Sequence, residues 1–281
     1  MTGAFAVVFL WIIDEGSSYT DGMQLHYRLQ GQGPTIVLLH GLFGSLDNLG
    51  VLARDLQRDY TILSPDLRNH GRSPHSAEMN YTLMAQDLLA LLAALSLPPV
   101  ILLGHSMGGK VAMAMALLAP QPIKQLLVLD IAPVAYDQQR HNAIFKGIQA
   151  VVDAEVVQRP AAVQVLRALN FEEATLHFLL KSFHQGQWRF NWPVLQRGYP
   201  AISGWDIPGS WGGPACFIGG ECSDYLLPTY HSQVKQQFPR AEIHRLPQAG
   251  HWLASEQPEA VLQRVRQFIA AAQEGQGGLS A

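Results

Sequence analysis

The chain has 281 residues, of which 48% are hydrophobic and 15% charged, a balance typical of a globular protein and not of a disordered one. This length predicts either two domains of ordinary size or one large α/β domain with an insertion. The formal net charge of -3 comes from 19 basic and 22 acidic residues, with no lysine or arginine run that could neutralise a row of phosphates, which excludes nucleic acid as an expected partner.

The N-terminal segment carries an apolar stretch, residues 4–13, that is too short for a membrane span and lacks the features of a signal peptide. We therefore expect no membrane span and a cytoplasmic protein, with residues 1–16 as an N-terminal extension. The two cysteines, Cys216 and Cys222, lack the spacing of a zinc site or a disulfide framework. Both are expected to be reduced and buried, and the sequence predicts no metal and no cofactor.

Short apolar segments alternate with helical patterns in the first half of the chain. An Asp21-Gly22 turn precedes residues 24–29, which predicts an antiparallel hairpin. Four continuous aliphatic runs follow, as expected of strands that helices cover on both faces, at residues 35–39, 60–63, 100–103 and 125–129. Helical patterns lie between them at residues 81–95 and 110–118. This alternation predicts a mostly parallel, doubly wound sheet that binds ligands at the carboxyl ends of its strands.

The alternation of strands and helices stops after Pro133. The next segment has only helical or irregular patterns, with helix-like runs at residues 138–154, 161–169 and 172–184. Two further strand patterns and an amphipathic helix close the chain, at residues 214–218, 241–246 and 258–271. We therefore predict an α/β core with an inserted helical cap and a flexible tail, at residues 17–133 and 210–272 for the core, 134–209 for the cap and 273–281 for the tail.

The pentapeptide Gly104-His105-Ser106-Met107-Gly108 directly follows an aliphatic strand pattern and directly precedes a helical one. In this setting a Gly-x-Ser-x-Gly motif predicts a nucleophile elbow, a strained turn that exposes the serine hydroxyl. The two glycines would let strand and helix pass closely because they have no side chains. The alternative is a glycine-rich helix start at which Ser106 only caps the helix. The setting favours Ser106 as a nucleophile.

A serine nucleophile needs a general base, and His251 is the best placed of the 11 histidines. It follows the last strand pattern and precedes the last helix, which puts it at the carboxyl edge of the sheet. Six other histidines are interpreted as structural or surface residues, the last three on cap helices: His40, His70, His105, His141, His177 and His184.

Ester cleavage passes through an oxyanion, and each backbone N–H group that stabilises it contributes roughly 10² to 10³ in rate. Two such donors are predicted. One is the N–H of Met107, at the start of the helix after the nucleophile, and the other is that of Leu42, in the loop after the first buried strand. The glycines at 41 and 44 in that loop could instead serve only to form a turn.

The acid that orients the base is expected between nucleophile and base in chain order, at the carboxyl end of a strand. Three residues meet this condition: Asp130, Glu221 and Asp224. The position that most often holds the acid, in the loop after the first strand beyond the cap, contains Ser223, with Asp224 one residue later. Asp130 could also be a structural cap of the turn that follows it. Spacing alone therefore leaves the choice open.

Six segments carry a pattern more specific than the pentapeptide, at residues 40–50, 66–71, 104–110, 130–133, 178–183 and 188–191. Through them the chain resembles the YbfF-type esterases of the α/β-hydrolase superfamily, from about residue 35 to residue 269. The resemblance implies an α/β-hydrolase fold and assigns the acid to Asp130. It also associates Ser223 with the triad. Asp224, where the family usually lacks an acid, is a second auxiliary candidate.

These residues predict a serine hydrolase that cleaves carboxylic esters through a Ser106-His251-Asp130 triad and an acyl-enzyme. The resemblance implies short to medium acyl esters and adds acyl-CoA thioesters as a second class, with apolar cap segments as the acyl pocket. The sequence specifies neither the leaving group nor the oligomeric state.

Three other functions are conceivable for a chain with these residues. A lyase or carbon–carbon hydrolase of the menaquinone-pathway type is the alternative, and such a lyase should direct several arginines toward the elbow. The available ones are Arg140, Arg159, Arg167, Arg189 and Arg197. A noncatalytic ligand receptor is disfavoured by the complete set of triad residues. Epoxide hydrolysis by the usual route is disfavoured because the nucleophile position holds serine and not aspartate.

Overall fold

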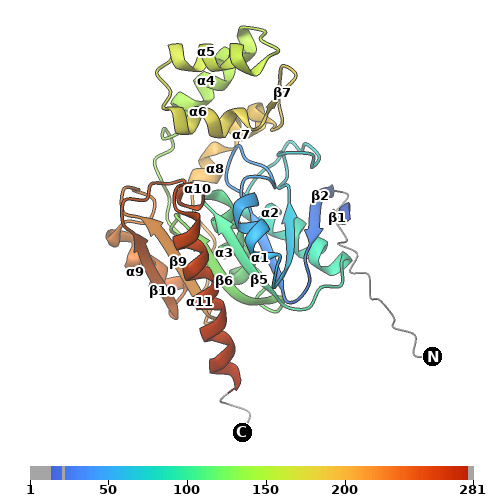
Figure 1. The fold of residues 1–281 in the computed structure, drawn as a ribbon, viewed down its shortest axis with the longest axis vertical. Coiled ribbons are helices and arrows are strands. Elements are labelled where there is room, and N and C mark those ends of the chain that lie inside the picture. The colour runs from blue at the N-terminus through green and yellow to red at the C-terminus, as the bar shows by residue number, and fades with distance from the viewer. Residues whose placement is uncertain (1–13, 21–22, 278–281) are drawn as a thin grey trace, which may run out of the picture.

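An eight-stranded sheet in the order β1-β2-β4-β3-β5-β6-β9-β10 forms the centre of the molecule (Figure 1). It is seen in a computed structural model that describes residues 14–20 and 23–277. β1 and β2 form an antiparallel hairpin, β2 pairs with β4 in antiparallel register, and all other neighbours pair in parallel. The strands are β1 (Asp14–Thr20), β2 (Met23–Gln30), β3 (Thr35–Leu39), β4 (Thr61–Pro65), β5 (Val100–His105), β6 (Ile123–Leu129), β9 (Ala215–Gly220) and β10 (Ala241–Leu246). The expected mostly parallel, doubly wound sheet is confirmed.

The central strands lie in the interior of the molecule because most of their residues are aliphatic. Every residue of β3 and β5 is buried, because helices cover both faces of the sheet. Neighbouring residues point to opposite faces, so that Leu102 belongs to one apolar core and Leu103 to the other. The first core contains α2 (Tyr81–Ala94) and α3 (Met107–Leu118), and the second contains α1 (Gly50–Leu56) and α11 (Pro258–Gly277).

Between β6 and β9 the chain leaves the sheet and forms a lobe above it, as Figure 1 shows. The lobe consists of α4 (Asn142–Asp153), α5 (Arg159–Ala168), α6 (Glu173–Leu180), β7 (Phe183–His184), β8 (Gln187–Trp188), α7 (Trp192–Arg197) and α8 (Tyr199–Ser203). It occupies the place of the predicted helical cap, and we call it the cap. The division into core residues 17–133 and 210–272 and cap residues 134–209 stays a prediction.

Several local details differ from the sequence-based expectations. β1 begins at Asp14, so residues 14–16, assigned to an extension, pair with β2. α11 continues to Gly277 and so includes part of the expected tail. His184 lies in the short strand β7 and not on a helix, since Gly186 adopts φ +79° and turns the chain into a hairpin. The Asp21-Gly22 turn and residues 1–13 and 278–281 lie outside the described residues.

The cysteines are only partly as expected. Both are free thiols; Cys216, within β9, is buried, but Cys222 is exposed because it lies in the loop after that strand. The remaining elements of this end of the chain are a 3-10 helix (Pro228–Tyr230), α9 (His231–Gln237) and α10 (Leu253–Glu256).

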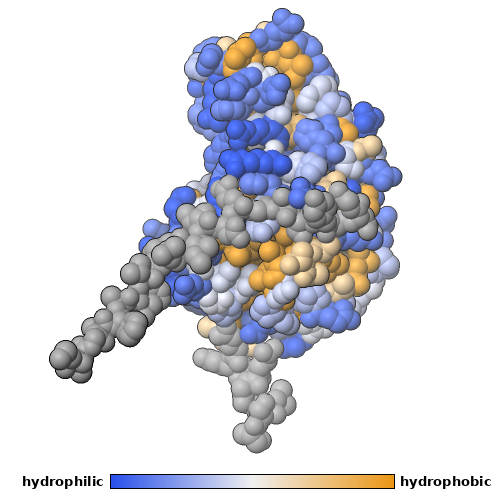
Figure 2. Space-filling view, turned by 90° about the vertical axis from the view of Figure 1, so that its right-hand side faces the viewer, coloured by the Kyte–Doolittle hydropathy of each residue, from blue (hydrophilic) through white to orange (hydrophobic). Residues whose placement is uncertain are grey.

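The surface seen in Figure 2 has hydrophobic areas at the tip of the cap and on the core, with a hydrophilic stretch between them. Exposed apolar side chains of the cap include Val152, Val157 and Leu169. Among the helices in residues 14–20 and 23–277, none has the length and apolar character that a membrane crossing needs.

Candidate active site

Ser106 lies at the tip of a sharp turn between β5 and α3. Its backbone has a positive φ of 53° with ψ -122°, which is costly for a residue with a side chain and persists only where the surroundings enforce it. The flanking glycines make the turn possible. A Cβ at Gly104 would lie 2.2 Å from the carbonyl oxygen of Gly108, and one at Gly108 would lie 2.3 Å from that of Leu39. This is the strand-turn-helix geometry that the pentapeptide predicts.

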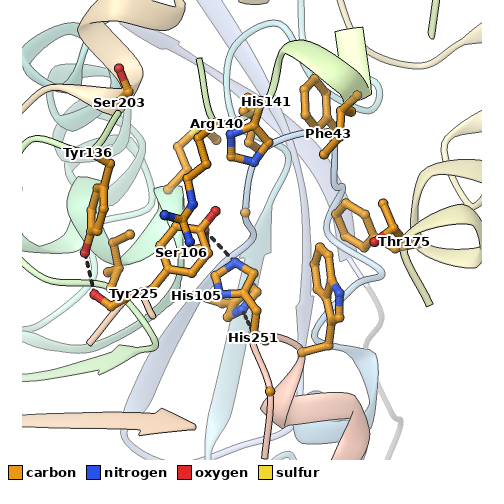
Figure 3. Close-up of a pocket in the computed structure, with 18 of the residues that line it drawn as sticks. Phe43, His105, Ser106, Tyr136, Arg140, His141, Thr175, Ser203, Tyr225 and His251 are labelled. Atoms are coloured by element: carbon orange, nitrogen blue, oxygen red, sulfur yellow. Dashed lines mark hydrogen bonds between the residues drawn. The ribbon is translucent and has the colours of Figure 1, made fainter. Parts of the chain in front are cut away.

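A line of hydrogen bonds runs from Ser106 through His251 to Asp130. Ser106 Oγ lies 3.1 Å from Nε2 of His251 (Figure 3), and Nδ1 of His251 lies 2.7 Å from Oδ2 of Asp130. Asp130 directly follows β6 and His251 follows β10, so the parallel sheet brings both to its carboxyl edge. Because a carboxylate only accepts, Nδ1 donates to Asp130 and Nε2 is left to accept the serine proton.

Asp130 is completely buried, and both of its oxygens accept hydrogen bonds. Oδ1 accepts from the backbone N–H of Gly220 at 3.0 Å, while Oδ2 accepts from the Ser223 hydroxyl as well as from His251. Burial raises the pKa of Asp130, but these hydrogen bonds and the electrostatic attraction of His251 outweigh burial and hold the pKa below its usual value. The carboxylate therefore stays ionised beside His251.

The two other acids considered from the sequence point elsewhere. The side chain of Asp224 is 63% exposed and forms an ion pair with Arg140, and Glu221 is exposed. Ser223 is the residue of this loop that reaches Asp130. The structure thus brings Asp130 and Ser223 together with His251 and leaves Asp224 with Arg140.

The loop after β3 passes directly against the elbow. A Cβ at Gly41 would lie 3.4 Å from the Cβ of Ser106, so the backbone of Leu42 is held close to the serine. Met107 is the first residue of α3, where backbone N–H groups lack partners within the helix. Leu42 and Met107 line the same cavity as Ser106, which is the placement expected of oxyanion donors.

Two buried histidines, interpreted from the sequence as structural, hold this loop in place. Nε2 of His40 accepts from the backbone N–H of Leu67 at 3.0 Å, and Nδ1 donates to the carbonyl of Gly41 at 2.8 Å. Nε2 of His70 likewise accepts from the N–H of Phe43 at 3.1 Å. Burial lowers the pKa of both rings, that of His70 to about 3. Both rings therefore stay neutral, which these hydrogen bonds require.

Two aromatic rings fix the position of His251. Nε2 of His105 donates to the carbonyl oxygen of His251 at 2.8 Å, and the ring of Tyr225 stacks on the imidazole with centroids 4.0 Å apart. Burial and the neighbouring His251 lower the pKa of His105 to about 4. From the sequence, His105 was interpreted as a structural or surface residue, and Tyr225 was not identified; its one signal is that it follows Ser223 by two residues.

Ser106 opens into a cavity of about 820 Å³ between the core and the cap. Figure 3 shows Tyr136 and Arg140 on one side of Ser106, and Phe43 and Thr175 on the other. One side of the cavity is therefore polar and the other more apolar, which gives an elongated substrate a preferred direction.

A second cavity of about 230 Å³ adjoins the first. Phe178 of α6 and Trp252, the residue after His251, line both cavities, and their ring centroids lie 4.0 Å apart. The pair forms the boundary between the two spaces, with one ring from the cap and one from the core.

His141, interpreted from the sequence as a structural or surface residue on a cap helix, instead lines the cavity. It precedes α4 and hydrogen bonds through Nδ1 with the hydroxyl of Tyr199. Burial, followed by the charges of His251 and Arg140, lowers the pKa of His141 to about 4. The cap thus presents a neutral imidazole to the cavity.

Similar proteins have the same fold and, by name, related activities. The Alpha/beta hydrolase family matches residues 36–264. Over 240 residues, the chain is 48% identical to Esterase YbfF of Escherichia coli (strain K12). This match covers 85% of this chain and 94% of that protein. It is 37% identical to the sn-1-specific diacylglycerol lipase ABHD11 of Mus musculus, with 84% of this chain and 81% of that protein covered.

Solved structures give the same result. The structure of a "Marine microorganism esterase" matches with a TM-score of 0.83 and 33% identity, covering 88% of this chain and 99% of that one. That of E-2-(Acetamidomethylene)succinate Hydrolase matches with a TM-score of 0.73 at 19% identity, over 92% of this chain and 100% of that one, a likeness of fold alone. The predicted fold and the predicted resemblance are confirmed: this chain is a hydrolase that belongs to the α/β-hydrolase family, among its YbfF-type esterases.

Proposed function

We propose that this protein hydrolyses carboxylic esters, with Ser106 as the nucleophile, His251 as the general base and Asp130 as the acid that orients the base. The observation that carries the proposal is the continuous line of hydrogen bonds, 3.1 Å from Ser106 Oγ to His251 and 2.7 Å from His251 to Asp130. Both distances lie within the reach that proton transfer requires. Ester cleavage also agrees with the names of the esterase and lipase relatives.

The chemical steps follow from this arrangement. Nε2 of His251 takes the hydroxyl proton as Ser106 attacks the acyl carbonyl, and the N–H groups of Leu42 and Met107 stabilise the resulting oxyanion. The imidazolium, held by the ionised Asp130, gives its proton to the leaving alcohol, and an acyl-enzyme remains on Ser106. Water then gives a proton to His251 and attacks the acyl group. The acid is released, and Ser106 regains its proton from the imidazolium.

The cavity supports a small acyl ester as the substrate. Its volume of about 820 Å³ falls within the roughly 300 to 1,000 Å³ of ordinary small-molecule sites. We assign the acyl chain to the side with Phe43 and Phe178, since burial of each methylene contributes about 0.8 kcal/mol. Acyl-CoA thioesters are a second class, because the same steps proceed with a thiol as the leaving group.

The distribution of arginines supports ester hydrolysis over a lyase reaction. Of the five arginines that could recognise a dicarboxylate, Arg140 alone lines the cavity, and its charge is paired with Asp224. Arg167 pairs with Glu173, and Arg159 donates to the carbonyl oxygen of Phe183. A dicarboxylate would therefore find one arginine beside Ser106, with its charge already paired, while the ammonium group of Lys110 is bound by three backbone carbonyl oxygens.

Two matched aspartate variants test the assignment of the acid. In Asp130→Asn, hydrolysis of p-nitrophenyl esters should fall on the order of 10⁴-fold, because the imidazolium loses its ionised partner. Asp224→Asn removes only an exposed ion pair and should change the rate by less than about threefold. A large loss in Asp224→Asn together with near-normal rates in Asp130→Asn would overturn the assignment.

A panel of substrates tests the reaction class. Acyl esters and acyl-CoAs of matched chain length are compared on the purified protein, with release of the acid as the common readout. We expect turnover of esters and, through the same residues, of thioesters. Absence of turnover with every member of both series would contradict ester hydrolysis as the function.

A further inference from the structure

Lys110 is a buried lysine one helical turn after Ser106, and the hydrolysis mechanism gives it no part. The residue is 1% exposed, and its Nζ donates to the carbonyl oxygens of Val134 at 2.8 Å, Ser203 at 3.1 Å and Gly204 at 2.8 Å. Val134 lies where the chain enters the cap, and the other two lie where the chain leaves it. We call the two segments that connect core and cap the crossings: the entering crossing contains Val134, and the leaving crossing contains Ser203 and Gly204. One side chain, on the helix that begins at the elbow, therefore holds both crossings.

Three aromatic rings surround the same ammonium group. Their centroids lie 4.8 Å from Nζ for Tyr136, 5.6 Å for Tyr81 and 5.8 Å for Trp205, within the range of cation–π attraction. Tyr81 comes from α2 of the core, while Tyr136 and Trp205 belong to the entering and leaving crossings. The N–H of Tyr136 also donates to the carbonyl of Ser203 at 2.9 Å. Lys110 thus lies at the point where core and both crossings meet.

A lysine close to a nucleophile could instead be a base, because burial lowers the pKa of Lys110 to about 7. The hydrogen bonds argue against this. An ammonium group offers three N–H donors, and three backbone carbonyls accept them. Neither a free N–H nor a lone pair is then directed at Ser106, so the arrangement fits a positioning role and not a catalytic one.

We propose that Lys110 is a positioning residue that fixes the cap above Ser106 by tying both crossings to the elbow helix, and that it thereby sets the affinity for acyl chains that contact the cap. The proposal rests on the proposed function, which assigns the acyl chain to the cap side of the cavity. A long chain contacts cap residues such as Ile144 and Phe178, whereas an acetyl group needs only the elbow and the Leu42 loop. Loss of the tie therefore affects long chains most.

The variant Lys110→Met tests this, since methionine fills similar space but donates nothing. We expect KM for p-nitrophenyl octanoate to rise about tenfold, while kcat for p-nitrophenyl acetate stays within about threefold of the unsubstituted protein. Lys146→Met is the matched control, because Lys146 is an exposed lysine on cap helix α4, and it should leave both substrates unchanged.

Hydrogen exchange of the free enzyme gives a second readout. In Lys110→Met, peptides that contain residues 132–137 and 200–206 should exchange faster, while a peptide over β5 keeps its protection. A general loss of stability would instead speed exchange in all of these peptides together. Equal kinetic losses with both esters, or unchanged exchange at the crossings, would overturn the proposal.

A replacement variant and the exchange experiment keep the proposal testable if Lys110→Met does not fold or if the proposed function fails. If Lys110→Met does not fold, Trp205→Leu replaces it. This variant removes one ring and the hydrogen bond from its indole N–H to Gln237, but it keeps the three hydrogen bonds of Lys110. KM for the octanoate should rise about threefold with the acetate unaffected. Equal losses with both esters in Trp205→Leu would again overturn the proposal. If the unsubstituted protein hydrolyses neither ester, the proposed function fails, and the exchange experiment still decides whether Lys110 holds the cap.

Discussion

Ser223 donates its hydroxyl hydrogen to Oδ2 of Asp130, the same oxygen that accepts from Nδ1 of His251. Both the serine and the aspartate are buried, so water does not compete for this oxygen. The hydroxyl stabilises the ionised carboxylate by binding Oδ2, while the backbone N–H of Gly220 binds Oδ1. Ser223 therefore supports the orientation of His251 without contacting it.

Replacement of Ser223 by alanine should raise the pKa of Asp130, because one hydrogen bond to the ionised form is lost. Activity that needs the carboxylate is present above this pKa and is lost as pH falls through it. The acid limb of the kcat/KM profile should therefore move to higher pH, with a loss of roughly tenfold at neutral pH. Steady-state rates of ester hydrolysis measured across pH give both effects. Ser232→Ala, at an exposed serine, is the control, and an unshifted acid limb in Ser223→Ala would contradict the role given to this residue.

Two buried histidines, His70 and His105, and the partly buried His141 should remain neutral well into the acid range. Burial lowers the pKa of His70 to about 3 and those of His105 and His141 to about 4, from the ordinary 6.5. At pH values between the ordinary pKa of 6.5 and these lowered pKa values, the three histidines bind protons in the unfolded chain but not in the folded chain. The free energy of unfolding should therefore decrease as pH falls from 6.5 toward 4, by about 1.4 kcal/mol per pH unit for each such proton.

Side-chain nitrogen shifts measured by NMR test this directly, with His141→Gln used to assign one ring. The shifts of the three rings should stay constant while pH is lowered from 7 to about 5. Urea unfolding over the same interval supplies the stability. A ring that takes up its proton near pH 6.5, or a stability that does not change with pH, would contradict the neutral state that burial imposes on these three rings.

The packed pair of Phe178 and Trp252 should limit the length of the acyl chain. Trp252→Ala would join the cavity of about 820 Å³ with that of about 230 Å³, so that additional methylenes become buried. We expect the ratio of kcat/KM for octanoate to that for acetate to rise about tenfold. Because Trp252 adjoins His251, the acetate ester serves as the internal reference for any change in the chemical step.

Phe178→Leu shortens the other side chain of this boundary, the one that the cap contributes. It should also raise the ratio of kcat/KM for octanoate to that for acetate, by a smaller factor. A ratio that stays constant in both variants would show that the second cavity takes no part in binding the acyl chain.

The residues that the sequence could identify are those that local pattern determines. The turn at Ser106 depends on its own two glycines and on the strand before it, and His251 lies between the last strand and the last helix. The choice of the acid could not be made from spacing, because it depends on contacts between distant segments. Asp224 is held by Arg140, 84 positions away, while Asp130 meets His251, 121 positions away.

The same reason explains which functional residues remained hidden. His40 lies at the end of a strand and Lys110 at the start of a helix, and neither pattern reveals a role. His40 orders the Leu42 loop through a residue 27 positions away, and Lys110 finds its acceptors 24 to 94 positions away in the two cap crossings. Their environments exist only once the core and the cap have packed together.

Fluorophosphonate labelling followed by peptide mass analysis tests the central claim most directly. The hydroxyl that His251 deprotonates should react first with this electrophile, so the account predicts a single adduct on Ser106, slow labelling of His251→Gln and no labelling of Ser106→Ala. Full labelling of the Ser106→Ala protein, or an adduct on a different serine, would contradict it.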